Sequence, residues 1–166
     1  MRGWWKWTVG PALMAGTAGI GPLSAQAAPD PCSLASNEEF QRAYEFDPRI
    51  GILPDVPTTT EMSWGPHCDY QSGSITLFTK RSPGAELDRV LGITKAKQRV
   101  PVQGLGERAF YTVIYPGDEY REQGFLAVFL GPRIVTFSMD AHNDEPVDAT
   151  RPRLEGLAKL VVPRIK

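Results

Sequence analysis

The chain has 166 residues, of which 18 are basic and 19 acidic, and its formal net charge is −1 at pH 7. Residues 28–166 hold all 19 acidic residues and 16 of the basic ones, so their net charge is −3. This acidic balance argues against nucleic acid or an anionic membrane surface as a partner. The length of this part suits one domain built on one core, and not two.

The first 27 residues have the order of a secretory signal peptide. Arg2 and Lys6 precede residues 7–23, which hold no charged side chain, and small residues in an A-x-A pattern end at Ala27. A membrane-spanning helix needs about 20 apolar residues, whereas this shorter run is interrupted by glycines and prolines. The pattern predicts cleavage after Ala27, a periplasmic or secreted product of residues 28–166, and no stable membrane anchor after cleavage. An uncleaved anchor is the alternative.

Cys32 and Cys68 are the two cysteines of the chain. An even count in an oxidising compartment predicts a disulfide. Closing a loop of about 36 residues is worth roughly 4 kcal/mol in the chain-entropy model. The alternative is a reactive thiol served by His67, and it is disfavoured because consecutive side chains of a strand point to opposite faces.

The N-terminal part of the exported chain predicts a helix followed by a loop. Ser36 and Glu39 form a capping box, in which the serine caps the helix and the glutamate reaches back to it. The helix should therefore run to about Phe46. Residues 47–58 contain several prolines and one glycine, and we expect them to form a loop.

Two strands and a second helix are expected next. The first strand is Thr59–Trp64, broken by Gly65 and Pro66, and Cys68–Gln71 continues it as a short strand or a bulged extension. The second strand is Ser74–Lys80, in which apolar and polar residues alternate. Ser82 should cap the second helix, which begins at Pro83 and runs to about Leu91.

The last third carries the clearest strand patterns. After a mixed connection over residues 92–106, the expected elements are strands at Arg108–Tyr115, Gly124–Leu130 and Arg133–Ala141 and a helix at Ala149–Val161. The second of these strands is apolar throughout, so it should be central and buried on both faces. Short turns favour antiparallel pairing. We therefore expect an α+β fold with a mainly antiparallel sheet of about five strands and helices packed on one face.

Three short motifs carry a family resemblance over residues 30–161. They are the run Asp30-Pro31-Cys32-Ser33-Leu34 before a capped helix, Cys68-Asp69-Tyr70, and the segment 102–111 around Gly104-Leu105-Gly106. Together they resemble a group of small exported bacterial domains of unknown function, many of which are lipoproteins. The resemblance implies a fold and a disulfide, but no agreed activity and no catalytic residues. This chain departs from the lipoproteins because Cys32 lies too far beyond the apolar run to be lipidated.

His67 and His142 are the only histidines. With Asp69, Asp140 and Asp144 they offer nitrogen and oxygen ligands for a divalent metal. Their spacing matches no known metal motif, so we interpret them as loop or strand-end histidines, and we expect no cofactor.

Aromatic residues provide the strongest indication of binding. Tyr111, Tyr115 and Tyr120 cluster around one predicted hairpin, and Trp64 and Tyr70 lie on strands that are possible neighbours. On the sheet face opposite the helices these side chains would make a binding surface, although core packing explains them equally well.

The sequence therefore predicts an exported, non-enzymatic binding or accessory domain. Its partner would be a cell-envelope protein or a small ligand. The alternative is a small envelope hydrolase or a metal-dependent enzyme that uses His67 and His142, and this alternative requires that the two histidines share a cleft.

Overall fold

A computed structural model describes residues 29–45, 57–79, 82–115, 121–142 and 144–165. The predicted signal peptide, nearly all of the predicted loop over residues 47–58, and Tyr120 lie outside these residues. No helix in the described part is long and apolar enough to cross a membrane.

The fold is α+β, as predicted, but its antiparallel sheet has seven strands and not about five. They are β1 (Thr58–Met62), β2 (Gly65–Tyr70), β3 (Gly73–Phe78), β4 (Val100–Val102), β5 (Arg108–Ile114), β6 (Gln123–Leu130) and β7 (Arg133–Asp140). Their order is β1-β2-β3-β7-β6-β5-β4. The sequence pattern missed β4 because a three-residue edge strand containing Pro101 is too short to show alternation.

Gly65 and Pro66 begin β2, although they were expected to break the strand. Gly65 has a φ of +147°, and a side chain there would lie 1.9 Å from the carbonyl oxygen of Leu77. The absence of a Cβ at Gly65 therefore lets β2 start close to β3.

The sheet joins two meanders. Strands β1, β2 and β3 form the first and β4 to β7 the second, and α2 (Pro83–Ile93) connects them. The meanders meet where β3 pairs with β7, with Ile75 opposite Phe137. Strand β6 lies between β5 and β7 and is buried on both faces, as its apolar sequence predicts.

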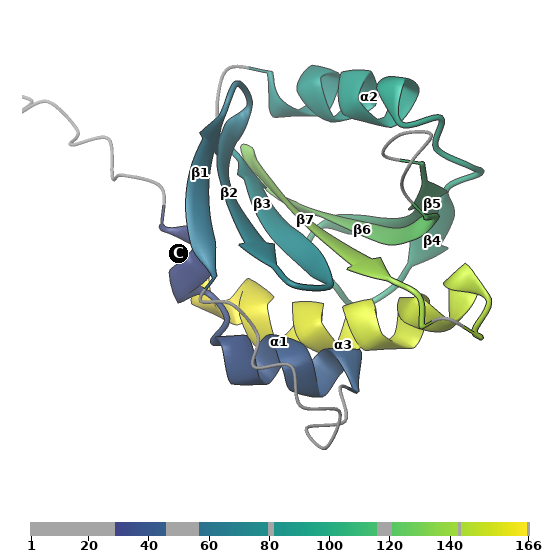
Figure 1. Cartoon of the computed structure of the whole chain (residues 1–166). Helices are drawn as coiled ribbons and strands as arrows, with labels where there is room; N and C mark the ends of the chain where they lie inside the picture. The colour runs from purple at the N-terminus through teal and green to yellow at the C-terminus, as the bar shows by residue number, and fades with distance from the viewer. Residues whose placement is uncertain (1–28, 46–56, 80–81, 116–120, 143, 166) are drawn as a thin grey trace, which may run out of the picture.

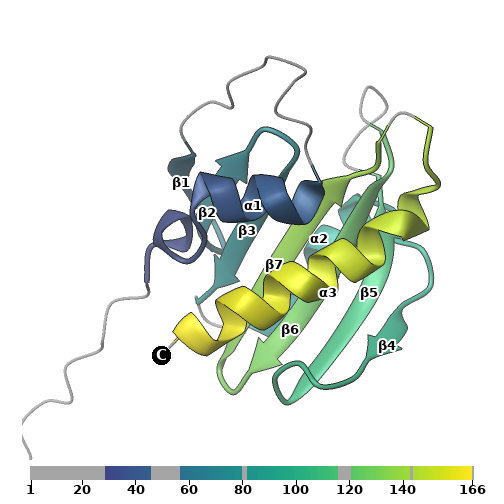
Figure 2. The ribbon, with the colours of Figure 1, turned by 90° about the horizontal axis from the view of Figure 1, so that it is seen from below.

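Helices cover both faces of the sheet, which corrects the expectation of one covered face. Leu126 and Val128 of β6 pack under α1 (Asn37–Tyr44) and α3 (Thr150–Val161), which lie side by side (Figure 2). Phe125 and Ala127 belong to the second core cluster, with residues of α2. Helix α2 lies on the face of the sheet opposite α1 and α3 (Figure 1). A strand that is apolar on both faces needs a cover on each face, so one layer of helices is not sufficient.

The caps of the first two helices differ. In α1, Ser36 Oγ accepts a hydrogen bond from the Glu39 amide (3.1 Å), and Glu39 Oε2 accepts one from the Ser36 amide (2.9 Å), which confirms the capping box. In α2, Pro83 takes the first position as predicted, but Ser82 makes no side-chain cap bond because its backbone is left-handed, with φ +62°.

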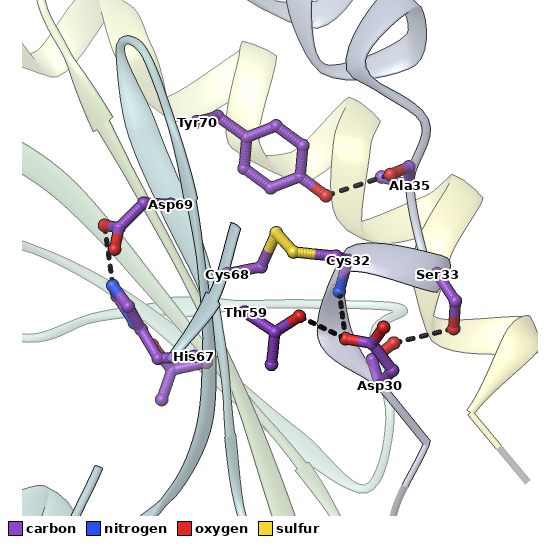
Figure 3. Close-up of a disulfide and its surroundings, with 10 residues drawn as sticks. Asp30, Cys32, Ser33, Ala35, Thr59, His67, Cys68, Asp69 and Tyr70 are labelled. Atoms are coloured by element: carbon purple, nitrogen blue, oxygen red, sulfur yellow. Dashed lines mark hydrogen bonds and ion pairs between the residues drawn. A yellow bond between two sulfur atoms is a disulfide. The ribbon is translucent and has the colours of Figure 1, made fainter. Parts of the chain in front are cut away.

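The predicted disulfide is present. Cys32 and Cys68 are bonded, with their Cα atoms 5.2 Å apart. The bond attaches the short helix η1 (Pro31–Ser33) to β2 (Figure 3). Beside it, Asp30 Oδ1 accepts hydrogen bonds from the Cys32 amide (3.0 Å) and the Thr59 hydroxyl (2.6 Å). The start of the described chain is thereby held against β1 and β2.

Candidate functional site

Two of the five aromatic residues predicted to form a binding surface are buried. Tyr70 stacks on Phe40 with ring centroids 4.1 Å apart and donates to the Ala35 carbonyl, and burial raises the pKa of its hydroxyl to about 12. Tyr111 is 2% exposed and bonds to Thr150. Both tyrosines belong to the core beneath α1 and α3, which agrees with the alternative of core packing for these two residues.

The remaining aromatic residues do not gather elsewhere. Trp64 stacks on Phe78 on the α2 side, with the Arg89 guanidinium 5.4 Å from its ring centroid. Tyr115 follows β5, on the other half of the sheet, and donates to Glu122. Tyr120 lies outside the described residues. The described residues therefore contain no common surface of these aromatic side chains.

The two histidines, in contrast, line one cleft of about 670 Å³. His67 comes from β2, and His142 follows the end of β7. We call this site the polar cleft. Its lining consists of Tyr44, His67, Asp69, Tyr70, Gln71, Gly73, Ser74, Arg121, Gln123, Ser138, Asp140, Ala141 and His142.

Strand alternation explains why polar side chains line this cleft. In β2, Cys68 and Tyr70 point toward α1, so His67 and Asp69 point to the opposite side of the strand (Figure 3). Ser74 of β3 lies directly opposite Asp69 in the pairing of β2 and β3. Ser138 of β7 is in turn the partner of Ser74, so the three polar side chains form one row across three strands.

The imidazole of His67 is held at both ring nitrogens. Nδ1 lies 2.7 Å from the Thr76 hydroxyl, and Nε2 lies 2.8 Å from Asp69 Oδ1. A metal ion would have to displace one of these partners. Among the described residues, no group of three His, Cys, Asp or Glu side chains is placed to hold a metal ion.

A hydroxyl, an imidazole and a carboxylate are linked by hydrogen bonds in the series Thr76–His67–Asp69, as in a catalytic triad. Catalysis also requires that the hydroxyl be accessible to a substrate, and here it is not. Thr76 is 6% exposed and does not line the cleft. Its hydroxyl is therefore closed to a substrate in the cleft. Thr76 and Asp69 fix the imidazole of His67 in place, and no exposed hydroxyl or thiol among the described residues is hydrogen-bonded to it.

Two further pairs of side chains are bonded to each other at the cleft. The hydroxyls of Ser74 and Ser138 lie 2.8 Å apart, and the Gln123 amide donates to Asp140 Oδ1 over 2.8 Å. Register explains both, since Ser74 is opposite Ser138 and Gln123 is opposite Asp140. These pairs hold their side chains in defined positions on the sheet.

The end of the cleft is formed by the contact between α1 and the residues after β7. His142 Nε2 lies 2.9 Å from the carbonyl oxygen of Tyr44, and the two rings are 4.4 Å apart at a tilt of 36°. Tyr44 is the last residue of α1. Residues 98 positions apart in the chain therefore make one wall.

Ser74, Ser138 and Gln123 were not predicted as site residues, and Asp140 was considered only as a possible metal ligand. The alternation in Arg133–Ala141 already assigns Ser138 to the face opposite Phe137 and Met139. That signal does not reveal which strand lies beside β7, so it does not reveal a shared cleft.

Neither a protein-family model nor a curated protein nor a solved structure matches the chain. The resemblance to small exported bacterial domains therefore stays a prediction.

Proposed function

We propose that this chain is an exported, non-enzymatic binding domain whose small ligand occupies the polar cleft. The observation that carries the proposal is the set of three hydrogen-bonded side-chain pairs that line the polar cleft: His67–Asp69, Ser74–Ser138 and Gln123–Asp140. A site whose polar groups are already fixed loses little side-chain entropy when a ligand binds.

The described side chains that line the polar cleft favour binding over catalysis, because none of their hydroxyls is hydrogen-bonded to a histidine. Thr76 is enclosed, and the Ser74 and Ser138 hydroxyls are bonded to each other rather than to His67. A general base near a reacting hydroxyl is the minimum that hydrolysis by a serine or threonine needs.

The N-terminal pattern and the disulfide support action outside the cytoplasm. Residues 1–27 have the order of a signal peptide, and a disulfide persists in oxidising compartments. We propose that the periplasm or the extracellular medium is the site of action. Mass measurement of the exported protein should give a chain that begins at Ala28.

The cleft can be tested by nuclear magnetic resonance of the ¹⁵N-labelled protein. We expect small molecules extracted from the cell envelope to shift the amide signals of Ser74, Ser138 and Gln123. Ser74→Phe should abolish these shifts because the ring fills the cleft. Gln103→Phe adds the same ring at an exposed position after β4 and should leave the shifts intact.

Three results would contradict the proposal. They are a lack of any binding, shifts confined to residues outside the cleft, and shifts that persist in Ser74→Phe. Recovery of the bound compound in chemically altered form would contradict the non-enzymatic part alone.

A further inference from the structure

The chemistry of the cleft lining points to a class of ligand. We infer that the polar cleft binds a neutral, polyhydroxylated molecule of the saccharide class. This inference rests on the proposed function and adds to it the identity of the ligand class.

An apolar ligand does not fit the lining. Among the described residues that line the cleft, Ala141 supplies the one aliphatic side chain. The aromatic ring of Tyr70 is in the core beneath α1. Binding of an acyl chain depends on burying apolar area, and most of the exposed lining of this cleft is polar.

The charges of the lining disfavour an anionic ligand. Asp69 and Asp140 contribute two carboxylates, against the single guanidinium of Arg121. A phosphate or carboxylate ligand would have to approach both acidic side chains. A hydroxyl group, in contrast, donates to a carboxylate in a charge-assisted hydrogen bond, which is stronger than one between neutral partners.

The bonded pairs also retain hydrogen-bonding capacity suited to neighbouring hydroxyls. The Gln123–Asp140 bond uses one amide N–H and Oδ1 of the carboxylate. It leaves the second N–H, the amide oxygen and Oδ2 for a ligand. One of the Ser74 and Ser138 hydroxyls donates a hydrogen bond to the other. The accepting hydroxyl keeps its own O–H donor, and both oxygens keep lone pairs for a ligand.

The spacing of these groups follows the sheet. Ser74 and Ser138 are on adjacent strands, and Gln123 and Asp140 are on the next adjacent pair. Adjacent strands lie about 4.8 Å apart, so donors and acceptors repeat on the scale of one sugar ring. A molecule with hydroxyls on successive carbons is able to bond to several of these groups at once.

The wall formed by Tyr44 and His142 adds an aromatic contact. Their rings lie together at one end of the cleft. The face of an aromatic ring carries partial negative charge and attracts the polarised C–H groups on one side of a sugar ring. The cleft thus combines hydroxyl-binding groups with an aromatic end wall.

The inference can be tested by titration calorimetry with named probes. The panel contains neutral hexoses, pentoses and N-acetylhexosamines with their linear trisaccharides, together with inorganic phosphate and a neutral tripeptide. We expect saturable binding of at least one saccharide and none of phosphate or tripeptide. Asp140→Asn should weaken saccharide binding about tenfold, which corresponds to about 1.4 kcal/mol.

Glu38→Gln is the matched control, because it removes one negative charge from an exposed position on α1. It should bind the saccharide like the unaltered protein. Equal affinities of Asp140→Asn and Glu38→Gln would overturn the inference.

The remaining outcomes separate the inference from the proposed function. Binding of phosphate or tripeptide in the cleft, without saccharide binding, overturns the ligand class but leaves a binding domain. If no saccharide binds but the envelope extract still shifts the amide signals of the cleft, the saccharide inference is contradicted and the proposed binding function is not. If neither the saccharides nor any component of the envelope extract binds, both the saccharide inference and the proposed binding function are contradicted.

Discussion

At the scale of single residues, Gly124 allows α3 to lie directly on the sheet. A Cβ on Gly124 would lie 1.8 Å from Thr150 Oγ1 and 3.1 Å from the Tyr111 hydroxyl. Those two groups bond to each other over 3.1 Å, and Thr150 also donates to the Val147 carbonyl (2.7 Å). The missing side chain of one residue therefore makes room for the polar contact between β5, α3 and the turn before it.

Gly124→Ala should destabilise the protein. The methyl group has to displace Thr150 and with it the start of α3, and overpacking of this kind costs about 1–3 kcal/mol. Gly156→Ala is the matched control, since nothing lies within 4 Å of a Cβ there and α3 gains a better helix former. Urea denaturation should show a lower midpoint for the first variant and an equal or higher one for the second. Equal midpoints for both would contradict the close packing at β6.

At the scale of elements, an ion pair joins α1 to the last described residues of the chain. Arg164 in η4 (Val162–Arg164) makes two hydrogen bonds of 2.7 and 2.8 Å to the carboxylate of Glu39 in α1. It also donates to the Leu34 carbonyl over 2.8 Å. The same glutamate completes the capping box with Ser36. One carboxylate therefore both caps α1 and attaches it to the C-terminal end of α3.

This arrangement predicts a pH dependence of stability. Hydrogen bonds from Arg164, and then from the Ser36 amide, lower the pKa of Glu39 from 4.5 to about 2. A lowered folded-state pKa stabilises the protein above pH 4.5, and this contribution is lost as the pH falls from about 4.5 to about 2. Because both side chains of the pair reach solvent, which screens their charges, its contribution should be small.

The measurement is the unfolding midpoint of Glu39→Gln and the unaltered protein between pH 2 and pH 7. The variant should be less stable at pH 7, and the difference should shrink as the pH approaches 2. The matched control is Glu38→Gln, which also removes a negative charge from the first turn of α1 but no ion pair among the described residues, so a smaller difference is expected. A constant difference between Glu39→Gln and the unaltered protein over the whole range would show that the carboxylate charge is not responsible.

At the scale of the whole molecule, the polar cleft exists because two meanders meet at β3 and β7. Ser74 and Ser138 are 64 residues apart and are bonded across that junction. The disulfide connects the first meander to η1 over 36 residues. Cys68 is fully buried at the bond, on the face of β2 opposite His67 and Asp69. The disulfide and the polar cleft therefore lie on opposite faces of β2.

Reduction of the disulfide should lower the stability of the whole domain. The chain-entropy model gives roughly 4 kcal/mol for a loop of this length. We expect a large fall in melting temperature with reductant, and the same fall in a Cys32→Ala, Cys68→Ala double variant without reductant. A double variant as stable as the oxidised protein would contradict this account.

Local sequence patterns predicted several elements of this fold. The capping box at Ser36 and Glu39, the alternation of β7 and the apolar run of β6 each depend on residues close in sequence, and each is present as predicted. The disulfide was predictable because only two cysteines were available to pair.

The tertiary structure alone decided the rest. Which strands are neighbours, that α2 covers the face opposite α3, and that Val100–Val102 is an edge strand all depend on pairing between distant segments. For the same reason, the candidate site in the structure is the polar cleft, and not the surface of five aromatic residues that the sequence predicted. Periodicity specifies which side chains share a face of one strand, whereas the strand that lies beside it is set by long-range packing.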